Sequence, residues 1–405
     1  MIKYIKTGNP ADCCGCRACE QICVHKAIEF KLDKEGFYYP EIDTEKCVDC
    51  GLCEKVCPMH KAESIIEKKG KAYAFQLSEK QHLLNSSSGG AFYAIASIII
   101  KNKGVVYGAA FRDKYVYQTR VDNISDLTKL MGSKYVQSDT NDTYSQVKKD
   151  LKDNKLVYYS GTPCQIAGLR LFLRRSYDNL ITTDLICHGT PSPKILADTL
   201  SRIEHRYKGK IVKCSFRDKK VGGWACSSSS SSSIARENGQ IKYVKHCVEQ
   251  EAYFKAFISG HLMRMSCYQC PFACTNRVGD ITIADYWGVK RLHPEFPNIS
   301  QGMSLLVVST DKGKQMLEAM SESNFVKEVN FEQAAAANHN LMNSTPYTDA
   351  RKNSYRLFNE DYYSFKKKYY KGNVLKNTIK AEIIYFIRSN NWVLKLVSKL
   401  VHLKK

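Results

Sequence analysis

The feature that most constrains this chain is a cysteine pattern that occurs twice near its N-terminus. Nine of the 17 cysteines fall between Cys13 and Cys57. Residues Met1–Pro10 are polar and lack the apolar core of a signal peptide, so we expect a cytoplasmic, reducing compartment. In that setting short, regular spacing indicates metal or redox chemistry and not a disulfide framework. The spacing C-x2-C-x2-C-x3-C is followed by Cys13, Cys16, Cys19 and Cys23, and again by Cys47, Cys50, Cys53 and Cys57.

Two cubane [4Fe-4S] clusters account for this repeat. In each run three closely spaced thiolates on a tight loop can reach one cluster, while the fourth points away and can bind the other. We therefore expect one cluster on Cys13, Cys16, Cys19 and Cys57, and a second on Cys47, Cys50, Cys53 and Cys23. Residues 11–58 resemble the bacterial two-cluster ferredoxins, except that Val24 stands where that family usually has proline. Zinc is the alternative metal, and Cys14 is expected to be a non-ligand.

The remainder of the chain predicts an α/β domain and a helical tail. Strand patterns alternate with helix patterns, which favours a central sheet. An Asn238-Gly239 hairpin and the strand 280–286 indicate that this sheet is mixed. The segment Lys61–Lys71 is charged and linker-like, and Ser227–Ser233 is expected to be a mobile loop or an atypical strand. The expected units are a ferredoxin domain (1–65), a mixed-sheet α/β domain (66–345) and a basic helical tail (346–405). Strands are predicted at 72–77, 105–111, 155–160 and 180–187, and helices at 91–101, 165–175 and 193–207.

Four further cysteines lie where an open α/β sheet binds its ligands. Cys164 and Cys187 each follow a predicted strand, and Cys267 and Cys270 form a C-x2-C pair. Ligands bind at the carboxyl ends of such strands, so the four thiolates can meet around one cluster. The alternative is that they are buried small apolar residues, which is common for isolated cysteines.

Several motifs of this region resemble the coenzyme F-420 hydrogenase/dehydrogenase beta-subunit family. The motifs are GTPCQIAGLRLF at 161–172, DLICHG at 184–189, CYQCPFAC at 267–274, GDITIADYWG at 279–288, Ser88-Gly89-Gly90 and Gly132-Ser133-Lys134-Tyr135. The resemblance spans roughly residues 70–345. It implies bound FAD, electron exchange with a deazaflavin coenzyme, and one [4Fe-4S] cluster on Cys164, Cys187, Cys267 and Cys270. Cys274 is the alternative ligand.

Candidate flavin-binding residues follow from these motifs. Ser88, Gly89 and Gly90 precede a helix whose free N–H groups favour phosphate; an ordinary helix N-cap is the alternative. Lys134 and Tyr135 are suited to hold a pyrophosphate and cover a ring; the alternative is a surface lysine beside a core tyrosine.

Three further positions complete the predicted site. We include Thr162 of the Gly161-Thr162-Pro163 turn among the cofactor-binding residues. His188 is the candidate proton donor, with a structural role as its alternative. Asp285 and Trp287 are expected to line the pocket, although a core tryptophan explains Trp287 equally.

Charge is concentrated at the C-terminus. The chain carries +21, and Tyr347–Lys405 holds 14 basic and four acidic residues, or +10. Val393, Leu396, Val397, Leu400 and Leu403 would line one face of a basic amphipathic helix, suited to an anionic membrane surface or an acidic partner. A helix packed on the protein's own surface is the alternative. No nucleic-acid motif is recognised, and no apolar run approaches the roughly 18–20 residues that a membrane span needs.

These features predict an iron–sulfur flavoprotein oxidoreductase. A flavin exchanges two electrons as hydride and clusters carry one at a time, so their combination converts between the two kinds of carrier. The expected partners are a hydride-carrying coenzyme, coenzyme F-420 or a similar carrier such as NAD(P)H, and a redox protein or ferredoxin. The alternative is a non-enzymatic electron-transfer or docking subunit of a larger complex.

Overall fold

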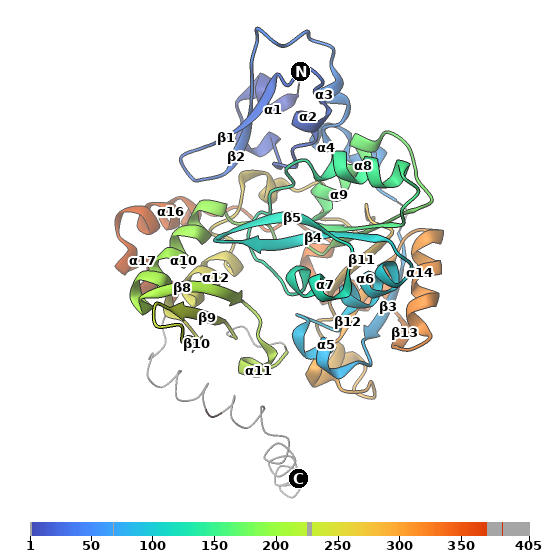
Figure 1. Ribbon diagram of the computed structural model, residues 1–405, viewed down its shortest axis with the longest axis vertical. Helices are drawn as coiled ribbons and strands as arrows, with labels where there is room; N and C mark the ends of the chain where they lie inside the picture. The colour runs from blue at the N-terminus through green and yellow to red at the C-terminus, as the bar shows by residue number, and fades with distance from the viewer. Residues whose placement is uncertain (1, 68, 225–228, 371–382, 384–405) are drawn as a thin grey trace, which may run out of the picture.

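An eight-stranded mixed sheet forms the centre of the protein. The computed structural model describes residues 2–67, 69–224, 229–370 and 383. The large sheet has the order β13-β3-β12-β11-β7-β6-β4-β5, and two smaller sheets pair β1 with β2 and β8 with β9 and β10 (Figure 1). The strands are β1 (Ile28–Leu32), β2 (Tyr38–Ile42), β3 (Lys71–Gln76), β4 (Val105–Arg112), β5 (Tyr115–Val121), β6 (Val157–Gly161), β7 (Leu180–Leu185), β8 (Gly209–Ser215), β9 (Ser231–Arg236), β10 (Ile241–Lys245), β11 (Ile281–Asp285), β12 (Ser304–Val308) and β13 (Phe325–Val329).

The helices alternate with these strands much as the sequence predicts. Those expected at 91–101 and 193–207 have the predicted bounds, and the one expected at 165–175 begins two residues earlier, because Pro163 occupies its first turn and Thr162 caps it. The α-helices are α1 (Lys3–Thr7), α2 (Ala18–Ile22), α3 (Leu52–Lys55), α4 (Pro58–Lys61), α5 (Lys80–Asn85), α6 (Ala91–Lys101), α7 (Ile124–Leu130), α8 (Thr143–Lys152), α9 (Pro163–Leu173), α10 (Pro193–Tyr207), α11 (Lys219–Gly222), α12 (Val248–Ile258), α13 (Val289–Leu292), α14 (Asp311–Ser321), α15 (Phe331–Ala336), α16 (Ala350–Glu360) and α17 (Tyr362–Tyr369).

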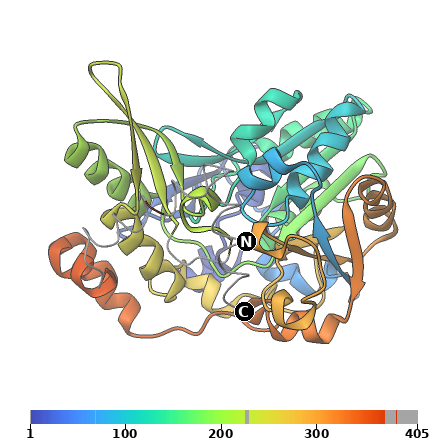
Figure 2. The same ribbon diagram turned by 90° about the horizontal axis from the view of Figure 1, so that it is seen from below.

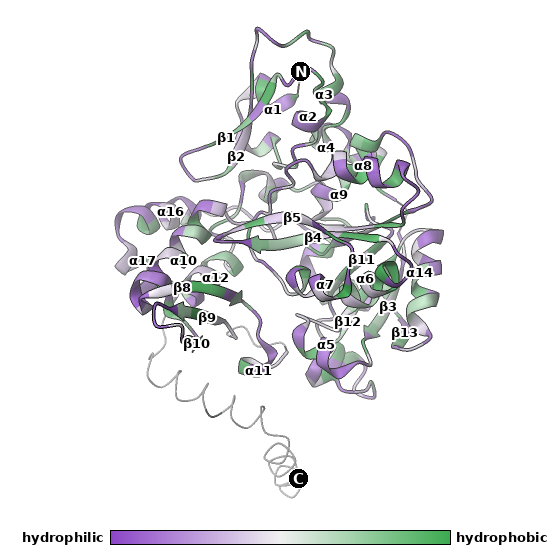
Figure 3. Cartoon of the chain, viewed as in Figure 1, coloured by the Kyte–Doolittle hydropathy of each residue, from purple (hydrophilic) through white to green (hydrophobic). Residues whose placement is uncertain are grey.

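Both faces of the large sheet are covered by helices. Strands β4, β6, β7 and β11 run parallel, while β5, β12, β3 and β13 are antiparallel to their neighbours. Because side chains alternate along a strand, Val106 and Tyr158 pack toward α6, whereas Tyr107 and Tyr159 pack toward α8 and α9. Helix α6 is hydrophobic along most of its length, while α8 and α14 carry hydrophilic turns (Figure 3). This arrangement confirms the predicted mixed α/β domain.

The N-terminal unit shares the hydrophobic core of the α/β domain. Cys16, Ala18 and Val56 are buried in the same cluster as residues of α8, α9, β4 and β6. In Figure 1 the unit lies at the top of the molecule beside α8 and α9. Polar contacts also join the two parts, since Thr140 donates to the carbonyl of Cys16 at 2.9 Å and Arg17 pairs with Asp139 at 2.6 Å. The unit is therefore packed against the large domain.

The segment expected to be a linker is also packed. Residues Ala62–Ser64 form a short 3-10 turn, and Ile65 and Ile66 contact the core beneath α9. The Glu67 N–H donates to Arg277 O at 2.7 Å, and its carboxylate pairs with Arg170 at 2.7 Å. The linker-like interpretation is thus wrong for these residues, because their apolar and backbone groups find partners.

The hairpin around Asn238-Gly239 forms as predicted but belongs to the separate β8–β10 sheet, so it does not help to make the large sheet mixed. Its turn projects from the body of the protein (Figure 2). Ser231–Ser233 open strand β9, which agrees with the atypical-strand alternative; Ser227 and Ser228 lie outside the described residues. Hydroxyls replace apolar contacts here, since Ser232 donates to Gln250 at 3.0 Å and Ser231 to Asp218 at 2.7 Å.

The first part of the predicted tail is helical and packs on the protein. Phe358, Phe365 and Tyr369 of α16 and α17 are buried against α10 and α12. The predicted amphipathic helix that contains Val393–Leu403 lies outside the described residues. Within the described residues, no helix combines the length and the apolar character that crossing a bilayer requires.

A buried ion pair links the centre of the sheet to the cysteine-bearing loops. Arg277 and Asp184 lie 2.9 Å apart and are 1% and 0% exposed. Arg277 also donates to the carbonyl oxygens of Phe272, Cys274 and Leu185. It therefore holds the loop after Cys270 against the end of β7.

Replacing Arg277 with methionine will leave Asp184 as a buried charge without its partner, which we expect to cost about 3–5 kcal/mol of unfolding free energy. The measurement is the midpoint of chemical denaturation. Arg356→Met is the control, because the Arg356–Glu360 pair is exposed and 3.5 Å long, and its loss should cost less than about 1 kcal/mol. Equal losses in the two variants would contradict the role given to the buried pair.

Candidate metal centres and cofactor site

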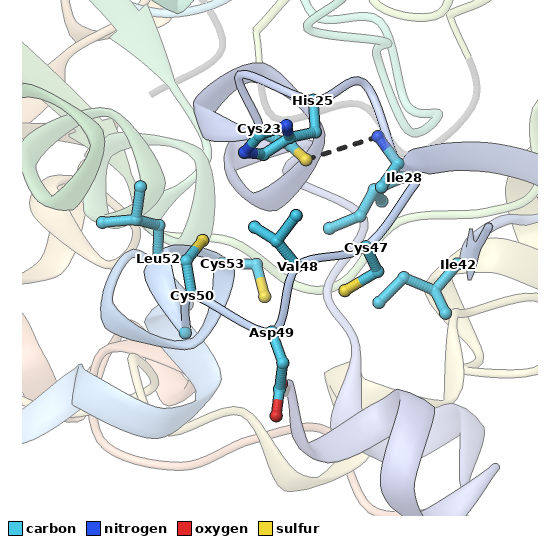
Figure 4. A pocket seen from close by; sticks show the side chains of 12 residues that line it. Cys23, His25, Ile28, Ile42, Cys47, Val48, Asp49, Cys50, Leu52 and Cys53 are labelled. Carbon is cyan, nitrogen blue, oxygen red and sulfur yellow. Dashed lines mark hydrogen bonds between the residues drawn. The ribbon is translucent and has the colours of Figure 1, made fainter. Parts of the chain in front are cut away.

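Four cysteines surround a cavity at the outer end of the N-terminal unit. Cys47 and Cys50 line it from the loop before α3, Cys53 lines it from α3, and Cys23 lines it from the end of α2 (Figure 4). Ile28 and Ile42 supply apolar walls. The Ala27 N–H points at the Cys23 sulfur at 3.4 Å, and Gly51, at φ 71°, lets the loop turn between Cys50 and Cys53. The structure thus brings together the second predicted ligand set, with one member from the other run.

The first predicted set meets at the inner end of the same unit. Cys13, Cys16 and Cys19 are buried. Burial and the nearby thiols of Cys13 and Cys57 raise the pKa of Cys19 well above its ordinary value. Burial and the proximity of Cys13 and Cys53 likewise raise the pKa of Cys57 to about 12. Metal binding must release these protons, because only thiolates ligate iron.

A third group of thiols lies at the carboxyl edge of the large sheet. Cys164 opens α9 after β6, Cys187 follows β7, and Cys267 and Cys270 come from the 3-10 turn Met265–Gln269 and its end. Because β6 and β7 are adjacent and parallel, their carboxyl ends lie side by side. Burial and the neighbouring thiols of Cys267, Cys164 and Cys270 raise the pKa of Cys187. All four residues of the third predicted set are therefore neighbours.

Cys274, the alternative ligand, lies apart from this group. Its thiol donates to the Asn276 carbonyl at 3.0 Å. Burial raises the pKa of Cys274, and the charged groups near it are Arg277 and Asp184. The geometry thus favours Cys267 and Cys270 over Cys274.

The thiol groups have the chemistry that iron–sulfur clusters need. In a cubane each of four thiolates binds a different iron, and each predicted set supplies four cysteines. Among the residues that the structure describes, no three His, Cys, Asp or Glu side chains converge closely enough to hold one metal ion.

Cys14 connects two of the groups. Its thiol interacts by hydrogen bonds with Cys16 and with Cys164, and the first of these raises the pKa of Cys14 well above its ordinary value. Cys16 belongs to the first set and Cys164 to the third. Cys14 therefore lies between two predicted cluster sites. Neither the cysteine spacing nor the residues next to Cys14 in the sequence predict this position.

Two of the predicted flavin-binding motifs meet in space, and a third segment joins them. Ser133 N donates to the Ser87 hydroxyl at 2.8 Å, and Lys219 Nζ donates to Ser88 O at 2.5 Å. Many of the N–H donors predicted to bind phosphate instead form hydrogen bonds within the protein. Gly89 N donates to the Ser304 hydroxyl at 2.9 Å, and a Cβ at Gly89 would stand 2.3 Å from Phe75 O, so tight packing explains this glycine.

The other predicted residues also have internal partners. Gly90, at φ 87°, is the N-cap of α6, as in the alternative interpretation. Lys134 Nζ donates to the carbonyls of Leu130 and Met131 at 2.9 and 2.8 Å, and burial lowers the pKa of Lys134 to about 7. Tyr135 packs against Phe254, with ring centroids 4.9 Å apart.

Two predicted residues lie outside this group. The Thr162 hydroxyl is 3.3 Å from the Cys164 sulfur, at the third thiol group. His188 is engaged at both ring nitrogens, with Nε2 3.0 Å from Ile258 O and Nδ1 3.0 Å from Asn340 Oδ1. This geometry favours the structural alternative for His188, and its catalytic role stays a prediction.

Sequence reasoning missed Arg217, which completes the polar group near Tyr135. Arg217 pairs with Asp285 and lies over the Trp287 ring, 5.4 Å from its centroid. Trp224 donates to Asp285 at 2.7 Å. One buried guanidinium nitrogen of Arg217, Nη2, has no hydrogen-bond partner among the described residues. The Tyr135 hydroxyl also interacts with the Arg217 guanidinium. An arginine held beside aromatic rings, with one nitrogen lacking a partner, suits an anionic aromatic ligand. No sequence motif marks this arginine.

The comparisons with known families agree with this architecture. Residues 154–334 match the family described as the C terminus of the coenzyme F420 hydrogenase/dehydrogenase beta subunit, and residues 12–61 match the 4Fe-4S dicluster domain. No curated protein matches the chain. A chain of the F420-reducing [NiFe] hydrogenase complex from Methanosarcina barkeri aligns with 72% of this chain and 93% of its own length, with 14% identity and a TM-score of 0.42.

The fold and the thiol groups define an iron–sulfur protein of the electron-transfer class. More closely, the chain joins a 4Fe-4S dicluster domain to the C-terminal domain of the coenzyme F420 hydrogenase/dehydrogenase beta-subunit family. The resemblance predicted from the sequence motifs is confirmed over residues 154–334 and 12–61.

Substituting Cys187 with serine tests the third thiol group. We expect Cys187→Ser to lose about four irons per chain after anaerobic reconstitution, because one cubane loses a ligand. Cys274→Ser, the matched control from the same loop region, should retain the full iron content. Iron and acid-labile sulfide analysis provides the measurement. A loss in the Cys274 variant with none in the Cys187 variant would reverse the assignment.

Proposed function

We propose that this chain is an iron–sulfur flavoprotein oxidoreductase that carries electrons between a hydride carrier and one-electron carriers. The observation that supports this most directly is the succession of thiol groups. The third group reaches the first through Cys14, and Cys53 of the second group lies near Cys19 and Cys57 of the first. Three clusters held there would form an electron path from the edge of the large sheet to the outer end of the N-terminal unit.

In this proposal the α/β domain also binds FAD, which when bound supplies hydride transfer and single-electron release. The residues best suited to hold it are Arg217, whose Nη2 has no partner among the described residues, and the rings of Trp287 and Tyr135. The Ser87–Ser88 turn and Ser133 lie beside them and would shape the site. Asp285 holds the Arg217 guanidinium in place.

The hydride carrier is proposed to be the deazaflavin coenzyme F-420 or a similar compound. This rests on the family of the domain and not on a contact in the structure. One-electron exchange is proposed to occur with a redox protein or ferredoxin at the second cluster, because Cys50 is exposed at the surface.

Anaerobic reconstitution with iron, sulfide and FAD tests the proposal. We expect about 12 irons and one FAD per chain, from three four-iron clusters. The Arg217→Gln variant should bind FAD about 10–100-fold more weakly, because a charge-assisted hydrogen bond contributes about 1.5–3 kcal/mol. Arg236→Gln, at the exposed end of β9, is the control and should bind FAD normally.

Two outcomes would contradict this function. A chain that holds four irons or none would lack the proposed path. A chain that holds its clusters but binds no FAD, and reduces nothing with F-420 or NAD(P)H as donor, would be an electron-transfer or docking subunit instead.

A further inference from the structure

Arg264 is the only one of the three most deeply buried arginines that has no carboxylate partner among the described residues. It is 0% exposed. Arg277 pairs with Asp184 and Arg351 pairs with Glu35, so the charges of both are compensated. Burying a charge without a counterion is costly. Arg264 therefore lacks the direct carboxylate partner that the other two arginines have among the described residues.

The side chain of Arg264 reaches into the N-terminal unit and binds neutral acceptors there. Nε donates to Cys13 O at 2.7 Å, and one terminal nitrogen, Nη2, donates to Tyr38 O at 2.9 Å. The other, Nη1, donates to Gln137 Oε1 at 3.1 Å. The guanidinium carbon lies 3.9 Å from the centroid of the Tyr39 ring. These contacts are all to neutral groups; the Asp33 carboxylate interacts with the cation only at longer range, without forming an ion pair.

The backbone of Arg264 belongs to the third thiol group. Its carbonyl accepts from Cys267 N at 3.0 Å, and its N–H donates to Thr190 O at 2.9 Å. The Thr190 hydroxyl in turn lies 3.9 Å from the Cys267 sulfur. A single residue thus contacts the loop of Cys13 through its side chain and the loop of Cys267 through its main chain.

We propose that Arg264 is the positioning residue that sets the reduction potentials of the first and third clusters and supplies the cation they share. This inference rests on the proposed function, since it requires clusters at both thiol groups. A cubane held by four thiolates is an anion and becomes more negative on reduction, so a nearby buried cation stabilises the reduced form. The second cluster, at the outer end of the unit, lies beyond this contact network.

The test compares three variants of the full-length, anaerobically reconstituted protein. Arg264→Gln removes the cation. Gln137→Glu places a carboxylate where Gln137 Oε1 now accepts from Arg264, and it also removes the hydrogen bond from Gln137 Nε2 to Cys14 O. Arg351→Gln is the control, because it removes a buried arginine at the same interface whose charge Glu35 already balances. EPR-monitored redox titration measures each midpoint potential, and the Cys187→Ser and Cys47→Ser variants identify the signals of the third and second clusters.

We expect Arg264→Gln and Gln137→Glu each to lower the reduction equilibrium constant of the first and third clusters about tenfold, which is about 59 mV for a one-electron couple. The second cluster and the Arg351→Gln variant should keep their potentials. Limited proteolysis near residues 61–71 measures docking independently of potential.

The inference is overturned if the first and third clusters keep or raise their potentials in both Arg264→Gln and Gln137→Glu. It is also overturned if Arg351→Gln shifts these potentials equally, because that result would indicate a loosened interface and not a lost charge. If Arg264→Gln fails to load iron, the potentials of the first and third clusters in Gln137→Glu decide, and a lowering of about tenfold in the equilibrium constant is again expected. Iron analysis of the unmodified protein separates the two hypotheses: fewer than about 12 irons contradicts the proposed function, whereas full loading without the shift contradicts only the role of Arg264.

Discussion

The packing of the N-terminal unit against the α/β domain is the constraint on which the rest of the structure depends. Cys16, Ala18 and Val56 are buried in a core that also contains residues of α9 and β6. Gly168 of α9 makes this possible, because a Cβ there would stand 3.0 Å from the Cys16 sulfur. A unit so small has little core of its own. Its burial against the sheet therefore both stabilises the loops that carry the cysteines and brings them to the third thiol group.

This packing converts separate cysteine motifs into one connected system. The Arg264 side chain binds the loop of Cys13 while its backbone binds that of Cys267, and Cys14 lies between Cys16 and Cys164. The same interface therefore sets both the distance between thiol groups and the charge around them. In the proposed function, electron transfer and cluster potential depend on these two quantities.

The region of the predicted flavin site shows how the protein uses its polar groups. Lys134 binds the C-terminal carbonyls of α7, and Gly89 packs against Phe75 and Ser304. These residues shape the segment around Ser133 and Tyr135 but have little bonding capacity left. Arg217 differs, since Asp285 holds its guanidinium while Nη2 has no partner among the described residues. The free hydrogen-bonding capacity thus lies on Arg217, in the segment after β8, and not on the backbone of Gly89.

The sequence alone determined the chemistry and much of the secondary structure of this protein. The cysteine spacing is a local signal, because four ligands within eleven residues can surround a metal cluster in only a few ways. The bounds of α6 and α10 are likewise local, since they follow from turn and capping residues nearby in the sequence. Only the tertiary structure decided that the β9–β10 hairpin joins β8 in a separate sheet, that Ile65, Ile66 and Glu67 pack against the large domain, and where Arg264 and Arg217 make their contacts. Their contacts join residues far apart along the chain, such as Arg264 and Cys13. Such pairings depend on which surfaces meet on folding, and no local spacing or periodicity records them.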